Sequence, residues 1–179
     1  MSEETIRTSA PEQDLSEILR VRRDKLKALQ DQGLDPFQQT KFVVSHHAQE
    51  IKDHFDDLEN ASVTVAGRLM SKRGMGKVSF CDLQDKSGRI QLYARKDEMD
   101  PEVYDRFKKY DIGDIVGVYG EVFRTQRGEM SVRARNIVLL SKSLLPLPEK
   151  FHGLTDKEAR YRQRYVDLIV NPEVRRAFE

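Results

Sequence analysis

The stretch ASVTVAGRLMSKRGMGKVSFCDLQDKSGRIQLY, residues 61–93, decides the fold because it predicts three consecutive β-strands. Apolar and polar residues alternate from Val63 to Leu69 and again around Ile90 and Leu92, and this two-residue period is typical of half-buried strands. Turns that contain glycine separate the alternating runs. The pattern therefore predicts strands over residues 61–70, 78–83 and 89–93.

The residues that follow complete the sheet. Residues 101–110 predict a short helix, and residues 115–123 and 130–140 predict two further strands. Gly117 and Gly120 interrupt the fourth strand and permit a bend or a bulge there. Five strands with a helix between the third and the fourth is the order of an OB-fold, a closed Greek-key barrel whose face around strands 2 and 3 commonly binds oligonucleotides.

Two helices are predicted before the barrel. The first begins after a capping Ser9, ends at Gly33 and carries one apolar stripe. Its many basic side chains could contact phosphates, but acidic residues are interleaved with them, which favours a helix that packs on its own domain. A short strand at residues 41–44 then leads to a second helix at 47–57, with Ser45 as its N-cap.

Helical segments are also predicted after the barrel. An extended segment rich in proline precedes a helix at residues 155–168, and Pro172 can begin another. The chain is therefore expected to be mainly β with helical additions. The expected domains are an N-terminal helical extension at 1–58 (disordered over about 1–10), the OB-fold at 59–142 and a helical linker at 143–179.

The amino-acid composition excludes several classes of protein. The 179 residues include 31 Lys+Arg and 30 Asp+Glu, so a net charge of +1 excludes a globally basic nucleic-acid coat and requires any nucleic-acid site to be a local patch. The single cysteine, Cys81, excludes an internal disulfide framework and suits a reducing compartment. The sequence has no apolar signal segment and no run as long as a membrane span, so we expect a cytoplasmic protein.

Sequence patterns for catalysis or metal binding are absent. The loop at residues 73–77 looks like a phosphate-binding loop, but Ser71 and Val78 stand where that motif needs a glycine and a hydroxyl residue. One cysteine and four scattered histidines define neither a nucleophile with its base nor a metal site. We expect no catalytic residue, metal or cofactor site within these residues.

A nucleic-acid surface is the chemistry that the remaining polar residues support. Basic residues gather around the first three predicted strands, and such groups can track a phosphate backbone while an aromatic side chain stacks on a base. They are Lys72, Arg73, Lys77 and Arg89, and two further arginines, Arg124 and Arg127, flank the turn between the fourth and fifth predicted strands.

Phe80 and Gln91 are the candidates for contact with a base. Phe80 faces outward if Cys81 lies in the core, but it joins the core if Val78 does, and alternation leaves both arrangements open. The neighbours of Gln91 on both sides are apolar and should face inward. Its amide is therefore expected on the outer face, where it can read a base edge or remain an ordinary solvated group.

The segments at 66–68, 72–80, 83–93 and 113–117, with Gly128-Glu129, form a pattern that resembles the anticodon-binding OB domain of class II bacterial lysyl-tRNA synthetases. The most specific part is the tail, LPLPEKFHGL at 145–154 and RYRQRYVDLI at 160–169. The related aspartyl and asparaginyl enzymes share the OB outline but not this whole stretch. The resemblance covers about residues 14–179.

The resemblance implies roles for individual residues. Phe80 would stack on the middle anticodon uracil, and Gln91 would form a hydrogen bond with the same base. Arg73 would contact the anticodon, and Glu129 would contact its first base. Arg68 also matches a family position, so the possible additional RNA contacts are Arg68, Lys72, Lys77 and Arg89.

The resemblance also implies the activity of a full-length protein. That protein would be a lysine–tRNA ligase that uses ATP and Mg²⁺ to form lysyl-adenylate and transfers lysine to tRNA(Lys). Its catalytic domain would begin after Glu179 and would form a homodimer, and the residues at hand would be a tRNA-binding part without catalytic residues. The alternative is a free-standing OB-fold module that binds single-stranded nucleic acid.

Overall fold

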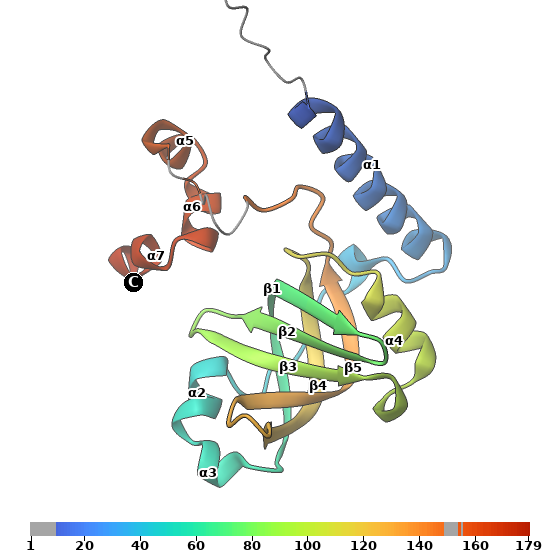
Figure 1. Cartoon of the computed structure of the whole chain (residues 1–179), viewed down its shortest axis with the longest axis vertical. Helices are drawn as coiled ribbons and strands as arrows, with labels where there is room; N and C mark the ends of the chain where they lie inside the picture. Colours follow the sequence, from blue (N-terminus) through green and yellow to red (C-terminus); the bar gives the residue numbers. More distant parts are fainter. Residues whose placement is uncertain (1–9, 149–153, 155) are drawn as a thin grey trace, which may run out of the picture. The chain divides into compact units, whose positions relative to one another are not determined.

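The computed structural model describes residues 10–148, 154 and 156–179 and contains a closed five-stranded barrel (Figure 1). The strands follow the order β1-β2-β3-β5-β4, and all neighbours are antiparallel except β3 and β5, which run parallel. This arrangement confirms the predicted OB-fold. The strands are β1 (Ser62–Met75), β2 (Val78–Gln84), β3 (Arg89–Arg95), β4 (Ile115–Arg124) and β5 (Met130–Ser141).

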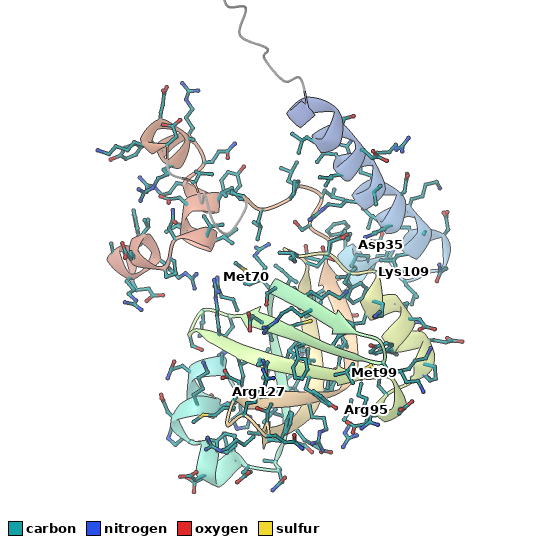
Figure 2. The ribbon with its side chains drawn as sticks, in the orientation of Figure 1. Asp35, Met70, Arg95, Met99, Lys109 and Arg127 are labelled. Atoms are coloured by element: carbon teal, nitrogen blue, oxygen red, sulfur yellow. The ribbon has the colours of Figure 1, made fainter. Side chains whose placement is uncertain are left out.

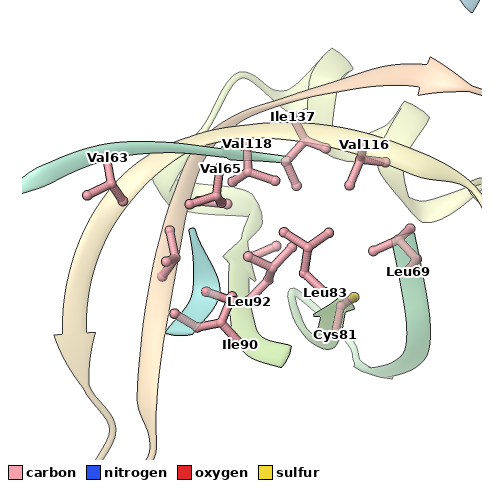
Figure 3. Close-up of a cluster of buried hydrophobic side chains, with 14 of the residues drawn as sticks. Val63, Val65, Leu69, Cys81, Leu83, Ile90, Leu92, Val116, Val118 and Ile137 are labelled. Atoms are coloured by element: carbon pink, nitrogen blue, oxygen red, sulfur yellow. The ribbon is translucent and has the colours of Figure 1, made fainter. Parts of the chain in front are cut away.

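The barrel interior is filled by the inward side chains of all five strands (Figure 3). In β3, Ile90 and Leu92 are buried, whereas Gln91 between them is only partly buried. In β2, Cys81 and Leu83 are the inward residues. Burying an aliphatic side chain of this size stabilises a fold by about 1.5–3 kcal/mol, so this alternation fixes which face of each strand meets water.

β1 runs on to Met75, beyond its predicted end at Met70, because it pairs with two neighbours. Residues 62–68 pair with β4 and residues 68–75 pair with β2, and a register shift between Leu69 and Ser71 lies where the strand changes partner. The turn to β2 is short, with Gly76 in the left-handed region at φ +62°. The hairpin predicted for the basic loop is thus confirmed.

The predicted strand at residues 41–44 is wrong, since these residues form no strand. Phe42 instead lies against β4, where its ring is 5.3 Å from that of Tyr119 in an edge-on arrangement. A Cβ at Gly117 would come within 2.3 Å of the Phe42 ring, so this glycine makes room for the aromatic side chain. Gly120 lies at a register shift between β4 and β5, as the expected bulge requires.

The first predicted helix is present as α1 (Ala10–Asp31). It ends in a paired cap, because the Gly33 N–H donates to the Gln30 carbonyl and the Leu34 N–H donates to the Leu29 carbonyl, with Gly33 at φ +73°. The cap expected at Ser9 and the expected disorder at the start of the chain lie outside the described residues. A short 3₁₀ turn, η1 (Pro36–Gln38), follows.

The second predicted helix is divided in two, α2 (Ala48–Asp53) and α3 (Phe55–Leu58). Its N-cap is His47 rather than the predicted Ser45, whose hydroxyl instead accepts a hydrogen bond from the Thr64 N–H of β1 at 2.8 Å. The Ala48 N–H donates to Asp85 at 2.7 Å, which ties the start of α2 to the end of β2. Ile51 and Phe55 are buried against the barrel as the pattern predicted.

A 3₁₀ turn, η2 (Lys96–Glu98), and helix α4 (Pro101–Lys108) connect β3 to β4. The Asp100 carboxylate accepts hydrogen bonds from the Glu102 and Val103 N–H groups and so caps the start of α4. Tyr104 and Phe107 are buried on its inner side. The predicted helix is confirmed, although it ends at Lys108 rather than at residue 110.

Charged side chains are buried or partly buried where α1 meets the loop before β4 and the end of β5. The Lys142 ammonium is 1% exposed and lies 2.7 Å from Asp111 and 2.8 Å from the fully buried Asp114. Lys25 of α1 approaches Asp111 at 2.8 Å, and Arg22 donates to the Ser143 carbonyl at 3.0 Å. We call Lys25, Asp111, Asp114 and Lys142 the buried ion cluster. It confirms that α1 packs on its own domain.

Contacts divide the chain into two units, Met1–Leu144 and Leu145–Glu179, and the second consists of short helices. The single helix predicted at residues 155–168 is wrong, because Gln163 separates two helices; its predicted start, Thr155, lies outside the described residues. The fully buried Asp167 accepts hydrogen bonds from Arg160 and Arg164. The helices are α5 (Lys157–Arg162), α6 (Arg164–Val170) and α7 (Pro172–Phe178), the last beginning at the predicted Pro172.

Candidate nucleic-acid interface

A groove of about 700 Å³ lies on the outer face of the barrel, between the sheet and the β4–β5 connection. Figure 2 shows Arg127 on this connection and Arg95 at the end of β3. Residues from all five strands or their connections form its walls. They are Arg73, Phe80, Gln91, Tyr93, Phe123, Arg124, Thr125, Gln126, Arg127, Glu129 and Arg133. All four predicted anticodon contacts are among them.

Strand register explains why these residues meet. Arg73 pairs with Phe80, Phe80 pairs with Tyr93, and Tyr93 pairs with Arg133 across the parallel junction. Outward side chains at paired positions lie side by side, so one row of residues crosses four strands. Gln91 belongs to the next outward row, because it pairs with Ser131.

Aromatic rings line the floor of the groove. Phe80 faces outward because Cys81 and Leu83 occupy the core, which settles the alternatives that the sequence left open. Its ring centre lies 5.3 Å from that of Tyr93, which in turn lies 5.5 Å from Phe123, and both contacts are edge-on. Edge-on packing holds the rings in place, and an aromatic ring on the floor of a groove can stack on a planar base.

The Gln91 amide has a defined orientation. The Ser131 hydroxyl, which is fully buried, donates to the Gln91 Oε1 at 2.9 Å. The oxygen is engaged by the protein, whereas the Nε2 protons have no hydrogen-bond partner among the described residues and are free for a ligand in the groove that Gln91 lines. Gln91 can therefore donate a hydrogen bond to a carbonyl oxygen of a base, and uracil carries two such oxygens.

The β4–β5 connection is a tight loop that positions Glu129. The Thr125 N–H donates to the Glu129 carbonyl, and the Glu129 N–H donates to the Thr125 hydroxyl at 3.0 Å. Gly128 adopts φ +85°, which permits the turn. These bonds hold the backbone of Glu129 and leave its carboxylate exposed as an acceptor at the rim of the groove.

Guanidinium groups give the groove a positive charge. Arg73 and Arg127 are exposed, and neither has a carboxylate within 4 Å in the part of the chain that the structure describes. Arg133 lies over the Phe123 ring at 4.5 Å and approaches Glu98 at 3.6 Å, while its buried Nε has no hydrogen-bond partner among the described residues. The arginines can bind phosphates or stack on bases.

The four possible additional RNA contacts do not line the groove. Arg68 donates to the Gly113 carbonyl at 2.8 Å, and Arg89 donates to the Gln84 Oε1 at the same distance. Lys72 donates to the carbonyls of Phe107, Lys108 and Tyr110, which closes the end of α4. Burial lowers the pKa of Lys72 to about 8. Lys77 is exposed on the β1–β2 turn.

Phe123 and Arg133 line the groove although the sequence did not predict them. Both flank buried valines, Val122 and Val132, so strand alternation could have placed them on the outer face. The predicted barrel implies that β5 pairs with β3, but the strand pattern does not give the register, and it is this register that brings Arg133 to Tyr93. Among the residues described, no group of three or more His, Cys, Asp or Glu side chains could hold a metal ion.

Residues 63–140 match the family model of the OB-fold nucleic acid binding domain. The chain is also 54% identical, over 97% of its length, to the lysine–tRNA ligase of Pelotomaculum thermopropionicum. It is 55% identical over 95% of its length to that of Syntrophomonas wolfei, and 55% identical over 93% to that of Carboxydothermus hydrogenoformans. It spans 34% of the length of each of these relatives. Within the described residues, no helix is long and apolar enough to cross a membrane.

Proposed function

We propose that this chain binds the anticodon of a tRNA in the groove of its OB-fold. The chain is similar to lysine–tRNA ligases and spans about a third of their length. One observation carries the proposal: Arg73, Phe80, Gln91 and Glu129, which lie on different strands or loops, line the same groove. These are the residues that the resemblance to the synthetase family singles out.

Each of the four side chains has a role that its position supports. Phe80 offers a ring face to the middle base of the anticodon, and Gln91 donates from its Nε2 to a carbonyl oxygen of the same uracil. Arg73 neutralises a phosphate or contacts a base edge, and Glu129 accepts a hydrogen bond from the first base. Unpaired anticodon bases can be read in this way because their edges and faces are free.

The complete protein in this proposal is a lysine–tRNA ligase. It activates lysine with ATP and Mg²⁺ as lysyl-adenylate and transfers the lysyl group to tRNA(Lys), acting as a homodimer in the cytoplasm. The residues at hand supply tRNA recognition, and their OB-fold carries no proposed step of that chemistry. We propose the boundaries of the three parts as 1–58, 59–142 and 143–179.

Replacement of Phe80 tests the proposal most directly. Phe80→Ala should weaken binding of an anticodon stem-loop with the sequence UUU by about 5- to 150-fold, because base stacking on an aromatic ring contributes about 1–3 kcal/mol. Fluorescence anisotropy with the 179-residue chain measures this change, and circular dichroism checks that the barrel is folded.

Phe37→Ala is the matched control. Phe37 is half exposed on η1 and does not line the groove, so its loss should leave the affinity unchanged. Equal affinities for Phe80→Ala and the wild type, with the fold intact, would contradict the assigned role of Phe80. Equal binding of stem-loops with and without the UUU anticodon by the wild type would contradict the proposed function itself.

A further inference from the structure

A second basic surface lies outside the groove, where α4 packs beside the β1–β2 turn (Figure 1). It is a shallow depression of about 790 Å³ on the outer side of α4. Lys77, Lys108 and Lys109, here called the turn lysines, are exposed along its edge. Lys108 donates to the Gly76 carbonyl at 3.4 Å and so holds the end of α4 to the turn.

The turn lysines are not neutralised by neighbouring carboxylates. The depression contains two acidic residues, and each is already close to another cation: Asp105 lies 3.3 Å from Lys96, and Asp97 lies 3.7 Å from Arg95. No carboxylate lies within 4 Å of a turn lysine in the described ranges 10–148, 154 and 156–179. The surface therefore carries an excess of positive charge in a chain whose total charge is +1.

The position of the turn lysines relates them to the groove. Phe80, on the groove floor, is three residues from Lys77 along the same hairpin, a separation of about 10 Å at the rise of an extended strand. Charges interact appreciably over the Debye length, which is about 8 Å at physiological salt. An RNA chain held at Phe80 thus has flanking phosphates within reach of flexible lysine side chains at the turn.

We propose that the turn lysines form a phosphate-binding site for the RNA backbone that flanks the bases held in the groove. The proposal rests on the proposed function, because it takes the groove to be the site of the bases. Lysine side chains with several rotatable bonds suit contacts with phosphates without regard to base identity. The groove then reads sequence, and the turn lysines add affinity and sensitivity to salt.

The test compares two double variants of the 179-residue chain. Lys77→Gln/Lys109→Gln removes two ammonium groups that have no hydrogen bond or ion pair with any residue that the structure describes, so the fold should persist. Lys41→Gln/Lys86→Gln is the matched control, because it removes the same charge from exposed lysines in the loop before α2 and in the turn between β2 and β3. Each protein is titrated with a UUU stem-loop and with a stem-loop of altered anticodon, over a range of salt concentrations.

We expect Lys77→Gln/Lys109→Gln to bind both RNAs about tenfold more weakly at 0.15 M salt. The slope of log K against log salt should become shallower by about 1.4–1.8, since each lost phosphate contact removes about 0.7–0.9. The control should retain the wild-type slope. An unchanged salt slope in Lys77→Gln/Lys109→Gln overturns the proposal. An equal loss of RNA affinity in the control variant also overturns it.

The two stem-loops separate this proposal from the proposed function. The ratio of their affinities for the wild type reports anticodon recognition in the groove, whereas the change in salt slope reports phosphate contacts at the turn. If the wild type binds both stem-loops equally and the variant has a shallower salt slope, anticodon recognition is rejected and the phosphate site is supported. If the wild type strongly prefers the UUU stem-loop and the variant keeps the wild-type salt slope, anticodon recognition is supported and the phosphate site is rejected.

Discussion

The groove and the buried ion cluster are two regions of the barrel unit with basic side chains, and the surroundings of these charges differ. In the cluster, Lys142 is 1% exposed and lies within 3 Å of two carboxylates. In the groove, Arg73 and Arg127 are exposed without a carboxylate nearby, within the described part of the chain. A buried charge must be paired, since removing it from water costs several kcal/mol, whereas an exposed unpaired charge remains free for a ligand.

The comparison shows why a count of arginines and lysines does not locate an RNA site. Lys72 is close to Arg73 in the sequence, yet its ammonium is used by three carbonyls at the end of α4. Arg22 of α1 likewise donates to backbone carbonyls of two distant segments. A cation that uses its donors on several such carbonyls is not available to RNA, whereas an exposed cation that keeps free donors is.

The largest effect should come from breaking the buried ion cluster. Lys142→Met leaves Asp114 buried without its charge partner, and we expect the free energy of unfolding to fall by about 3–5 kcal/mol. Urea denaturation followed by circular dichroism measures this loss. Arg127→Gln, which removes an exposed cation from the groove, should change stability by less than about 0.5 kcal/mol and weaken RNA binding instead. A loss below about 1 kcal/mol for Lys142→Met would show that the cluster is not a structural element.

A smaller effect, on RNA affinity rather than on stability, should follow when the hydrogen-bond donor of Gln91 is replaced by an acceptor. Gln91→Glu replaces the amide donor with an acceptor that faces the uracil carbonyl, so affinity for a UUU stem-loop should fall by roughly 5- to 150-fold, or about 1–3 kcal/mol. Gln32→Glu, an equal change of charge at an exposed position outside the groove, is the control. Competition titrations with the wild type and both variants measure the effect. Equal affinities of Gln91→Glu and the wild type would contradict the orientation inferred for Gln91.

The smallest effect is a dependence of stability on pH. Burial acts to raise the pKa of Asp111, but hydrogen bonds from Lys142 and Lys25 outweigh it and hold that pKa below its usual value. Because the folded pKa is depressed, Asp111 contributes full stability above its unfolded pKa, near 4, and this contribution is lost as the pH falls through the folded value.

Asp111→Asn isolates this pH effect, because it removes the titrating carboxyl. The variant should be less stable than the wild type at pH 6, and its stability should fall less steeply between pH 5 and pH 3. Urea denaturation at several pH values provides the comparison. Parallel profiles for the two proteins would indicate that Asp111 does not titrate differently in the folded state.

Several parts of the fold followed from local patterns. Alternation predicted β2 and β3 and the outward placement of Gln91, because inward positions must be apolar wherever one face of a strand meets the core. Gly33 predicted the end of α1 because glycine adopts the left-handed conformation that the helix cap requires. These features depend on residues that are close together in the sequence.

Predictions that depended on distant partners were less successful. The strand predicted at residues 41–44 is absent, because Phe42 packs into the space above Gly117 instead of joining a ladder. The predicted end of β1 was too early, since β1 finds a second partner beyond its register shift. Ser45 does not cap a helix, because its hydroxyl accepts a hydrogen bond from β1.

The sequence by itself determined the strand order, the turns and the residues that a family resemblance makes candidates for RNA contact. Only the tertiary structure decided that Phe80 faces the groove, that Arg133 joins it, and that Lys72 and Lys142 are engaged within the protein. The physical reason is that periodicity and turn formation are local properties of the chain. Burial and charge pairing depend instead on which distant segments the closed barrel brings together.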